Sequence, residues 1–264
     1  YIAGINIESV YQDLIRENQY QPFSGLVLTD TFQLYEQEKD MINDLLPDNS
    51  NKRTAQKNRE IKIIIGNPPY SSGQSSANDN AQNVSYPNLE NSIKINYSNT
   101  SSSTLKNSLY DSYIKAFRWA TERIKDEGII GFVTNAGWIE SFATEGLRKN
   151  FSNEFNKIYI LNLRGNQRTK GEMSRKEGGK IFGSGSRTPI AITFLVKNKK
   201  NNKKAEINYY DIGDYLKRDQ KLSIIKNFKS IKQLKLQKKF KKIIPDENFD
   251  WINQGNKEYQ KFVP

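Results

Sequence analysis

The chain has 264 residues, of which 36% are apolar, and its 41 Lys and Arg against 29 Asp and Glu give a formal net charge of +12. The sequence contains neither Cys nor His, which excludes disulfides, thiolate or imidazole metal ligands, and catalysis by a Ser-His or Cys-His pair. The chemistry that remains belongs to carboxylates, amides, backbone groups and aromatic rings, acting with a cofactor that brings its own reactive carbon.

No apolar run approaches the roughly 20 residues that a transmembrane helix needs, and no signal peptide opens the chain. We therefore expect a cytoplasmic protein without a membrane partner. The chain starts with Tyr rather than Met, and we expect it to be part of a longer protein.

The first quarter of the chain holds three short apolar runs, which we predict to be strands. Between the first two runs, residues 10–18 have helical spacing. The third run is almost wholly apolar, as in a strand that is covered on both faces. The runs are residues 2–7, followed by Glu8; residues 25–29, followed by Asp30; and residues 61–65, followed by Gly66 and Asn67.

The next segment, residues 71–104, is rich in Ser and Asn and has no periodicity. We predict a long loop there, beside the active face. Apolar residues from Leu105 to Ile124 recur at i, i+4, which predicts an amphipathic helix that ends at Gly128. Residues 128–134 are the fourth predicted strand.

The alternation of strands and helices continues to the C-terminal part of the chain. We predict a helix over residues 140–151 and strands over residues 157–163 and 189–196. Residues 205–211 are a candidate edge strand, and residues 215–228 a helix that leads into a lysine-rich segment. This order predicts an α/β fold with a mostly parallel sheet that is covered by helices on both sides.

The positive charge is concentrated in one part of the chain. Residues 197–242 hold 16 basic and 4 acidic side chains, whereas residues 1–196 hold 23 and 21. We therefore predict a core over residues 1–196 and a basic C-terminal extension over residues 197–264. The basic stretch is either a solvated face or an electrostatic footprint for phosphates. A smaller basic cluster, residues 164–187, carries seven basic and two acidic residues with six glycines and is predicted to be a loop.

Polar residues follow three of the predicted strands, and in open α/β sheets ligands bind outside the carboxyl ends of the strands. An acidic residue that closes an early strand commonly accepts hydrogen bonds from a ribose diol. Glu8 and Asp30 are candidates for this role. The alternatives are a favourable charge at a helix N-terminus for Glu8 and a turn or N-cap for Asp30.

The segment Asn67-Pro68-Pro69-Tyr70 has a specific chemical character. Proline disfavours the helical conformation for the residue before it, so Asn67 holds its amide at the end of the strand. Neither proline has an N–H, so the carbonyls are rigid acceptors without competing donors. Such a segment suits an exocyclic amine, whose two N–H groups bond to the Asn67 side-chain oxygen and the Pro68 carbonyl while Tyr70 stacks on the ring. A plain Pro-Pro turn is the alternative.

The sequence has, in this order, predicted strands that end at Glu8, at Asp30 and at Asn67-Pro-Pro-Tyr70, and then the strand over residues 128–134. In this order it resembles the amino-group DNA methyltransferases that use S-adenosylmethionine. The resemblance covers about residues 1–196 and is strongest to the adenine-N6 methyltransferase part of large fused helicase–methyltransferase restriction-modification proteins of the type ISP kind. Asn rather than Ser at position 67 favours adenine over cytosine N4 by this resemblance. The strings that carry it are Leu28-Thr-Asp-Thr-Phe-Gln33, Ile65-Gly-Asn-Pro-Pro-Tyr70, Leu109-Tyr-Asp-Ser-Tyr113, Gly128-Ile-Ile-Gly-Phe-Val-Thr134 and residues 164–187.

The resemblance implies a Rossmann-like methyltransferase sheet and assigns roles to residues of this chain. Asn67, Pro68, Pro69 and Tyr70 would be the catalytic loop; Glu8 would hold the cofactor ribose, and Asp30 and Phe32 would lie near its adenine. Phe182 would stack on the opposite face of the target base, with a buried loop anchor as the alternative. The basic loop would contact DNA through Arg164, Arg168, Arg175, Lys176 and Arg187.

The implied partners are double-stranded DNA and other regions of the same polypeptide, namely helicase and nuclease regions upstream and a target recognition region downstream. No metal is expected in this part. One departure from the family concerns the cofactor: its glycine-rich loop lies roughly 20 residues before the acidic position, and here only seven residues precede Glu8. We therefore expect a sheet truncated at its N-terminal strand, half a cofactor site, and poor binding of S-adenosylmethionine by this chain alone.

The predicted reaction is methyl transfer to adenine N6 in double-stranded DNA, after the base has left the duplex. Two other functions stay open. An Asn-Pro-Pro-Tyr loop also suits a glutamine side-chain amide or a base of ribosomal RNA. A non-catalytic module could use the same fold and its lysine block only to bind nucleic acid.

Overall fold

The computed structural model describes residues 2–15, 19–35, 47–70, 85–104, 106–183, 187–200 and 204–253. Leu105 and residues 71–84 of the predicted loop lie outside these ranges. The chain divides into two compact units, Tyr1–Glu60 and Ile61–Pro264. The functional division that we expect at residue 196 stays a prediction. Within the described ranges, no helix combines the length and the apolar character that crossing a membrane requires.

The first unit is helical, which corrects two predicted strands. It contains α1 (Ile2–Ile15), the short 3-10 helix η1 (Phe32–Tyr35) and α2 (Pro47–Asn58). Residues 2–7 thus lie in a helix, and residues 25–29 form no strand. A short apolar run fits either a helix or a strand. A helix bonds its own backbone groups, whereas a strand needs a neighbour, and the described part of this unit has none.

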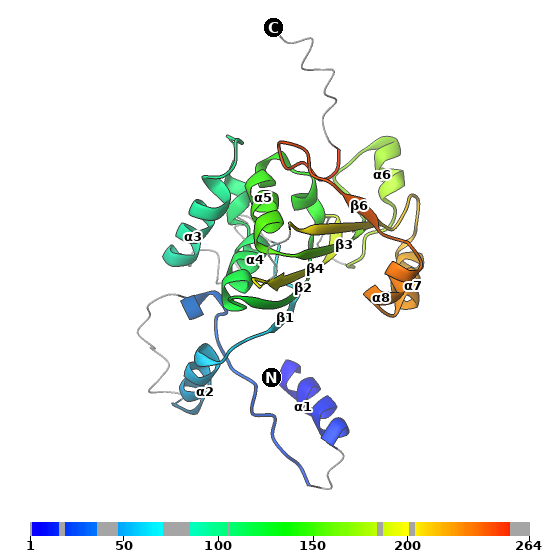
Figure 1. The fold of residues 1–264 in the computed structure, drawn as a ribbon. Helices are drawn as coiled ribbons and strands as arrows, with labels where there is room; N and C mark the ends of the chain where they lie inside the picture. The colour runs from blue at the N-terminus through cyan, green and yellow to red at the C-terminus, as the bar shows by residue number, and fades with distance from the viewer. Residues whose placement is uncertain are drawn as a thin grey trace. The chain divides into compact units, whose positions relative to one another are not determined.

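The second unit is built on a six-stranded sheet with the order β1-β2-β4-β3-β5-β6 (Figure 1). β1 pairs in parallel with β2, and β3 with β5, whereas β4 runs antiparallel to β2 and β3, and β6 antiparallel to β5. Four strands therefore point the same way, which confirms the mostly parallel sheet. The strands are β1 (Ile63–Gly66), β2 (Glu127–Asn135), β3 (Lys157–Arg164), β4 (Ile190–Asn198), β5 (Glu206–Asp211) and β6 (Lys241–Ile243).

The strand predicted over residues 205–211 is confirmed as β5, but its position at the edge is wrong, because β6 pairs with the other side of β5. β6 carries Lys241 and Lys242, which are exposed, and one buried apolar residue, Ile243. A three-residue strand with exposed lysines has no alternating apolar pattern and escapes detection in the sequence. It also fits a position at the edge of a sheet, where lysines discourage further pairing.

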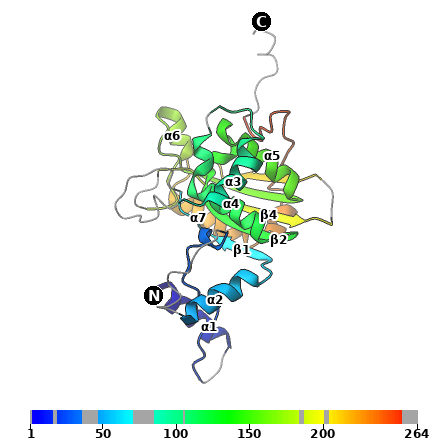
Figure 2. The same ribbon diagram turned by 90° about the vertical axis from the view of Figure 1, so that its left-hand side faces the viewer.

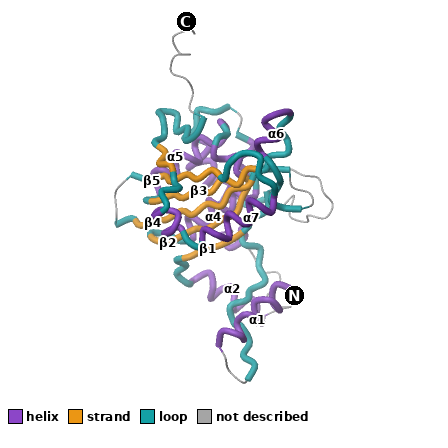
Figure 3. Tube along the Cα trace, turned by 90° about the vertical axis from the view of Figure 1, so that its right-hand side faces the viewer, coloured by secondary structure: helices purple, strands orange, loops and turns teal. Residues whose placement is uncertain are grey.

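Helices cover both faces of the sheet, as Figures 2 and 3 show. On one face, Phe117 of α4 packs against Phe132 of β2, with ring centroids 5.3 Å apart. On the other face, apolar residues of α7 and α8 pack against Leu161 and Leu163 of β3. The helices of this unit are α3 (Pro87–Ile93), η2 (Lys94–Ser98), η3 (Asn107–Tyr110), α4 (Ser112–Arg123), η4 (Ala136–Ile139), η5 (Phe142–Thr144), α5 (Glu145–Glu154), α6 (Gly171–Glu177), α7 (Arg218–Phe228) and α8 (Ile231–Leu236).

The long loop predicted over residues 71–104 is wrong for its second half, which contains α3 and the π-helical turn η2. Leu89, Ile93 and Tyr97 are all fully buried. They are spaced four residues apart, which is the spacing of one helix face. The i, i+4 spacing of these three residues is present in the sequence, but the many Ser and Asn residues around them led to the prediction of a loop.

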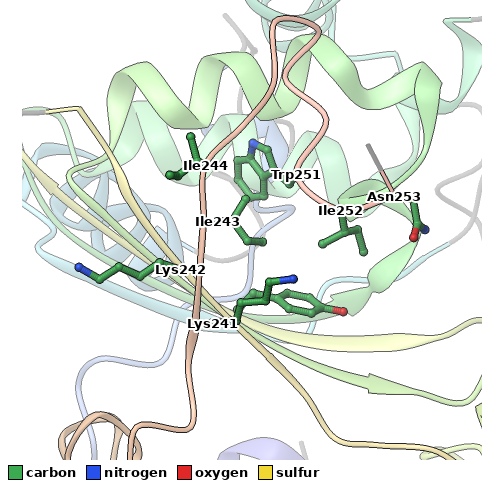
Figure 4. Close-up of a pocket in the computed structure, with 8 residues that line it drawn as sticks. Lys241, Lys242, Ile243, Ile244, Trp251, Ile252 and Asn253 are labelled. Carbon is green, nitrogen blue, oxygen red and sulfur yellow. The ribbon is translucent and has the colours of Figure 1, made fainter. Parts of the chain in front are cut away.

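A pocket of about 410 Å³ lies beside β6 (Figure 4). The figure shows Lys241 and Lys242 pointing in opposite directions from the strand, as neighbours in a strand do. Because β6 and β1 are at opposite ends of the strand order, this pocket is separate from the segment that follows β1. Its lining residues are Tyr209, Lys241, Lys242, Ile243, Ile244, Trp251, Ile252 and Asn253.

Candidate active site

The segment Asn67 to Tyr70 leaves the sheet at the carboxyl end of its outermost strand, β1. Asn67 and Pro69 are exposed, while Pro68 and Tyr70 are half-buried. The Tyr70 hydroxyl donates a hydrogen bond to Asn67 Oδ1 at 3.0 Å, and burial raises the pKa of Tyr70. A carbonyl oxygen has two lone pairs, so Asn67 Oδ1 keeps the capacity to accept a second donor from solvent.

The structure brings Tyr70 next to Phe182, which comes from the other end of the predicted site. Their ring centroids are 6.5 Å apart and the ring planes are inclined by 37°. Both rings are partly buried against the apolar cluster that contains Leu163 and Ile190. Atoms in contact lie about 3.5–4 Å apart, so a flat ring between two others needs about 7 Å or more. The present spacing of 6.5 Å is slightly short of that, so binding of a base requires the two rings to move apart.

The basic residues of the loop after β3 fall into two groups. Arg164 is committed to carboxylates: its Nε lies 2.7 Å from Asp211 Oδ1, and Nη1 also pairs with Asp214. These ion pairs tie the ends of β3 and β5 together, and they compete with any contact of Arg164 to DNA. The other candidates are exposed, although Arg175 pairs with Glu172 at 3.3 Å and Arg187 donates to the Gln167 carbonyl at 3.2 Å. They are Arg168, Arg175, Lys176 and Arg187.

The three predicted cofactor residues lie in the first unit and already have local partners. Glu8 lies on α1, not at the end of a strand, and its carboxylate accepts hydrogen bonds from the Tyr20 hydroxyl (2.8 Å) and the Phe23 N–H (3.3 Å). Asp30 Oδ1 accepts the Phe32 N–H at 3.1 Å at the start of η1, which is the turn role weighed as its alternative. Their cofactor roles stay predictions.

Asp111 is a buried carboxyl near this region, and the sequence patterns predict no role for it. It is the N-cap of α4 and is only 8% exposed. Since α4 ends just before β2 begins, its N-terminus lies toward the carboxyl ends of β1 and β2. Asp111 Oδ1 has no hydrogen-bond partner among the described residues. Burial raises the pKa of Asp111 to about 6, while the backbone N–H groups of Tyr113 and Ser112 and the charge of Arg168 oppose the rise.

The raised pKa makes the stability of the fold depend on pH. The native state prefers the protonated Asp111, so this contribution is complete below about pH 4 and is lost as the pH rises through about 6. Asp111→Asn keeps an N-cap side chain without the charge. At 1.36 kcal/mol per pKa unit, we expect it to stabilise the chain by about 3 kcal/mol at pH 8 and by little at pH 4. Urea titrations at both pH values measure the difference; a loss of stability at pH 8 contradicts the expectation.

Comparison with known proteins gives the family of the chain. The family described as Eco57I restriction-modification methylase matches residues 5–168. Comparison with curated proteins gives no match.

Three solved structures are similar over nearly the whole chain. A nuclease-deletion mutant of the Type ISP restriction-modification enzyme LlaGI, in complex with a DNA substrate mimic, is 49% identical, with a TM-score of 0.91 over 99% of this chain and 21% of that chain. The ATP-dependent Type ISP enzyme LlaBIII, bound to DNA, is 40% identical, with a TM-score of 0.92 over 99% and 18%. DrdV, in a complex with DNA, is 33% identical, with a TM-score of 0.84 over 98% and 24%.

The chain thus spans about a fifth of the length of these relatives. The family match covers the segments that carry the strings quoted above up to β3, and it confirms the resemblance to the methyltransferase part of fused restriction-modification proteins. The chain belongs to the Eco57I restriction-modification methylase family.

Proposed function

We propose that this chain, as part of its full-length protein and not alone, transfers a methyl group from S-adenosylmethionine to N6 of an adenine in double-stranded DNA. The observation that carries the proposal is the exposed acceptor corner at the end of β1, where Asn67 and Pro68 offer carbonyl oxygens and the rings of Tyr70 and Phe182 lie 6.5 Å apart. Membership of a methylase family supports methyl transfer as the reaction. The relatives in complexes with DNA support DNA as the substrate.

The chemistry of the corner is that of an amine acceptor. Asn67 Oδ1 and the Pro68 carbonyl each accept one N–H of the adenine amino group, which draws the nitrogen lone pair out of conjugation with the ring. The lone pair is then directed at an electrophilic methyl carbon. As the N–C bond forms, the bond from that carbon to sulfur breaks and N6 releases one proton to solvent, so no base with a shifted pKa is needed. When bound, S-adenosylmethionine supplies the electrophilic methyl group. The corner contributes orientation, which is among the largest sources of rate enhancement available to an enzyme.

In the first unit, the carboxylate of Glu8 has the chemistry to bind the ribose of the cofactor. A carboxylate that accepts two hydrogen bonds, as Glu8 does from Tyr20 and Phe23, has the chemistry to accept two ribose hydroxyls instead. Binding of the cofactor then requires the Tyr20 hydroxyl to leave Glu8. The exposed side chain of Tyr20 makes this exchange inexpensive.

Stacking on Tyr70 and Phe182 offsets the free energy needed to extrude the target base from the duplex. Removing a base from the duplex costs a few kcal/mol, and stacking on an aromatic ring returns about 1–3 kcal/mol per ring. Tyr70 and Phe182 therefore roughly balance the cost. The exposed Arg168, Arg175, Lys176 and Arg187 supply phosphate contacts that position the DNA but carry no sequence information.

The role of the Tyr70 ring can be separated from that of its hydroxyl. Tyr70→Ala removes the stacking surface, and we expect a 10- to 100-fold lower rate of methyl transfer, in line with about 1–3 kcal/mol of stacking. Tyr70→Phe removes only the hydrogen bond to Asn67 Oδ1 and keeps the rate within about threefold. Single-turnover rates at saturating DNA measure both. Equal losses in the two variants contradict a stacking role.

Transfer of a labelled methyl group tests the function itself. The full-length protein is incubated with labelled S-adenosylmethionine and duplex DNA, and the DNA is digested to nucleosides. The proposal expects label in N6-methyladenosine. Label in N4-methylcytosine, in ribosomal RNA or in a protein glutamine contradicts it, and so does DNA binding without any transfer.

A further inference from the structure

Lys221 of α7 is a fully buried lysine within the most basic part of the chain. Its Nζ donates hydrogen bonds to the Glu177 carbonyl at 2.7 Å and to the Gly179 carbonyl at 2.9 Å. Burial lowers the pKa of Lys221 to about 8, with Arg164 lowering it further and the charges of Glu177 and Asp211 opposing. A buried ammonium is costly unless it is well bonded. The two carbonyl bonds of Lys221 satisfy this requirement, and they also hold the segment around Glu177 and Gly179 in place.

A second cation of the same helix bonds to the same segment. Arg218 lies one turn before Lys221 on α7, and its Nε donates to the Ile181 carbonyl at 2.8 Å. The two side chains thus bind the carbonyls of residues 177, 179 and 181, which alternate along the segment. We call this pair of side chains the α7 clasp.

The segment held by the clasp approaches the start of α7 closely. The Gly179 N–H donates to the Leu216 carbonyl at 2.9 Å. A Cβ on Gly178 would lie 2.3 Å from the Leu216 oxygen, and one on Gly179 would lie 2.6 Å from the Arg218 nitrogen. Only glycine fits at such distances. The glycines and the clasp together fix the path of the backbone as far as Ile181.

Phe182 is the next residue after this fixed backbone, and its ring contacts Tyr70. Both side chains of the clasp bond to backbone carbonyls of this segment, so the clasp acts on the site through the position of Phe182. We propose that Lys221 is a positioning residue for methyl transfer: by holding the carbonyls of Glu177 and Gly179 it keeps Phe182 beside Tyr70, so that both rings are in place to receive the target base. This role rests on the proposed function.

Four variants of the full-length protein test the role. Lys221→Met removes the ammonium but keeps an unbranched apolar side chain; Phe182→Ala removes the ring; the third variant combines both changes. Lys226→Met, on an exposed position of the same helix, is the matched control. Single-turnover methylation at saturating DNA gives the rate, and the fluorescence of 2-aminopurine at the target position reports the unstacked base.

We expect Lys221→Met and Phe182→Ala each to slow methylation about tenfold and to reduce the 2-aminopurine signal equally. The double variant should be no slower than Phe182→Ala alone, because one residue acts through the other. The control should match the wild type. Additive losses in the double variant, or a wild-type rate for Lys221→Met, overturn the role.

Arg218→Gln is a milder second test, because the Arg218 side chain is about half exposed and its loss leaves no buried charge. We expect a loss of about threefold in rate, again absent when Phe182 is alanine. An unchanged rate in this variant contradicts the proposal that the α7 clasp positions Phe182. A wild-type protein that fails to methylate DNA overturns the proposed function; an active wild type with an unaffected Lys221→Met overturns only the role of Lys221.

Discussion

Replacing Asn67 by alanine is expected to lower the rate of methyl transfer about a thousandfold. The variant loses the side-chain oxygen that accepts one N–H of the target amine, and the second acceptor, the Pro68 carbonyl, cannot orient the amine alone. Removing one oriented polar group that acts on the reacting centre typically costs a factor of 10² to 10³. The loss also leaves the Tyr70 hydroxyl without its bond to Asn67 Oδ1.

The expected loss lies in the chemical step and not in folding or binding. Asn67 is exposed, so its removal opens no cavity, and thermal unfolding should stay unchanged. Single-turnover rates measured with saturating cofactor and DNA isolate the step. Asn227→Ala, at an exposed position of α7, is the control and should match the wild type. A rate for Asn67→Ala within tenfold of the wild type contradicts the assignment of the corner.

Replacing Arg148 by methionine is expected to destabilise the unit Ile61–Pro264 by about 3–5 kcal/mol, the range for breaking a buried ion pair. Arg148 is fully buried, and its guanidinium donates to the Ser141 carbonyl at 2.6 Å, to the Phe249 carbonyl at 2.8 Å and to Asp250 Oδ1 at 2.6 Å. It thereby joins the segment before α5 to a segment a hundred residues later. Burial raises the pKa of Asp250, and the charge of Arg148 opposes the rise.

In Arg148→Met, we expect the C-terminal segment, residues 246–252, to unfold at a lower urea concentration than the rest of the unit. Trp251 is 3% exposed and packs on Trp138 at 5.6 Å between ring centroids. Hydrogen exchange of residues 246–252 and tryptophan fluorescence should therefore report release of this segment at lower urea than the sheet. Asn153→Ala, at an exposed position of α5, is the control. A stability of Arg148→Met within 1 kcal/mol of the control contradicts this account.

The sheet could be predicted from the sequence because its strands are apolar runs between polar or glycine residues. β1, β2, β3 and β4 lie within two residues of their predicted ranges at either end. Where a segment finds no strand to pair with, as in residues 2–7, the same apolar run folds as a helix and the prediction is wrong. The pairing partner, which sequence patterns do not contain, decides between the two.

Some residues of the candidate site could likewise be predicted from the sequence, and others could not. The position of Asn67 at a strand end and the aromatic partner Phe182 were predicted, and the structure brings Tyr70 and Phe182 together. Asp111 lies in one of the strings that carry the family resemblance but was given no role, and Lys221 was missed, because a buried charged residue has no pattern of its own. Lys221 is one of 16 basic residues between positions 197 and 242 and is indistinguishable from them by sequence.

The position of the target amine tests the central claim most directly. It can be measured in a structure of the full-length protein with a cofactor analogue and a DNA duplex from which the target adenine has been extruded. We expect N6 within about 2.7–3.2 Å of both Asn67 Oδ1 and the Pro68 carbonyl oxygen, with Tyr70 and Phe182 on opposite faces of the base. An amino group bound elsewhere, with Asn67 Oδ1 still bonded only to the Tyr70 hydroxyl, contradicts it.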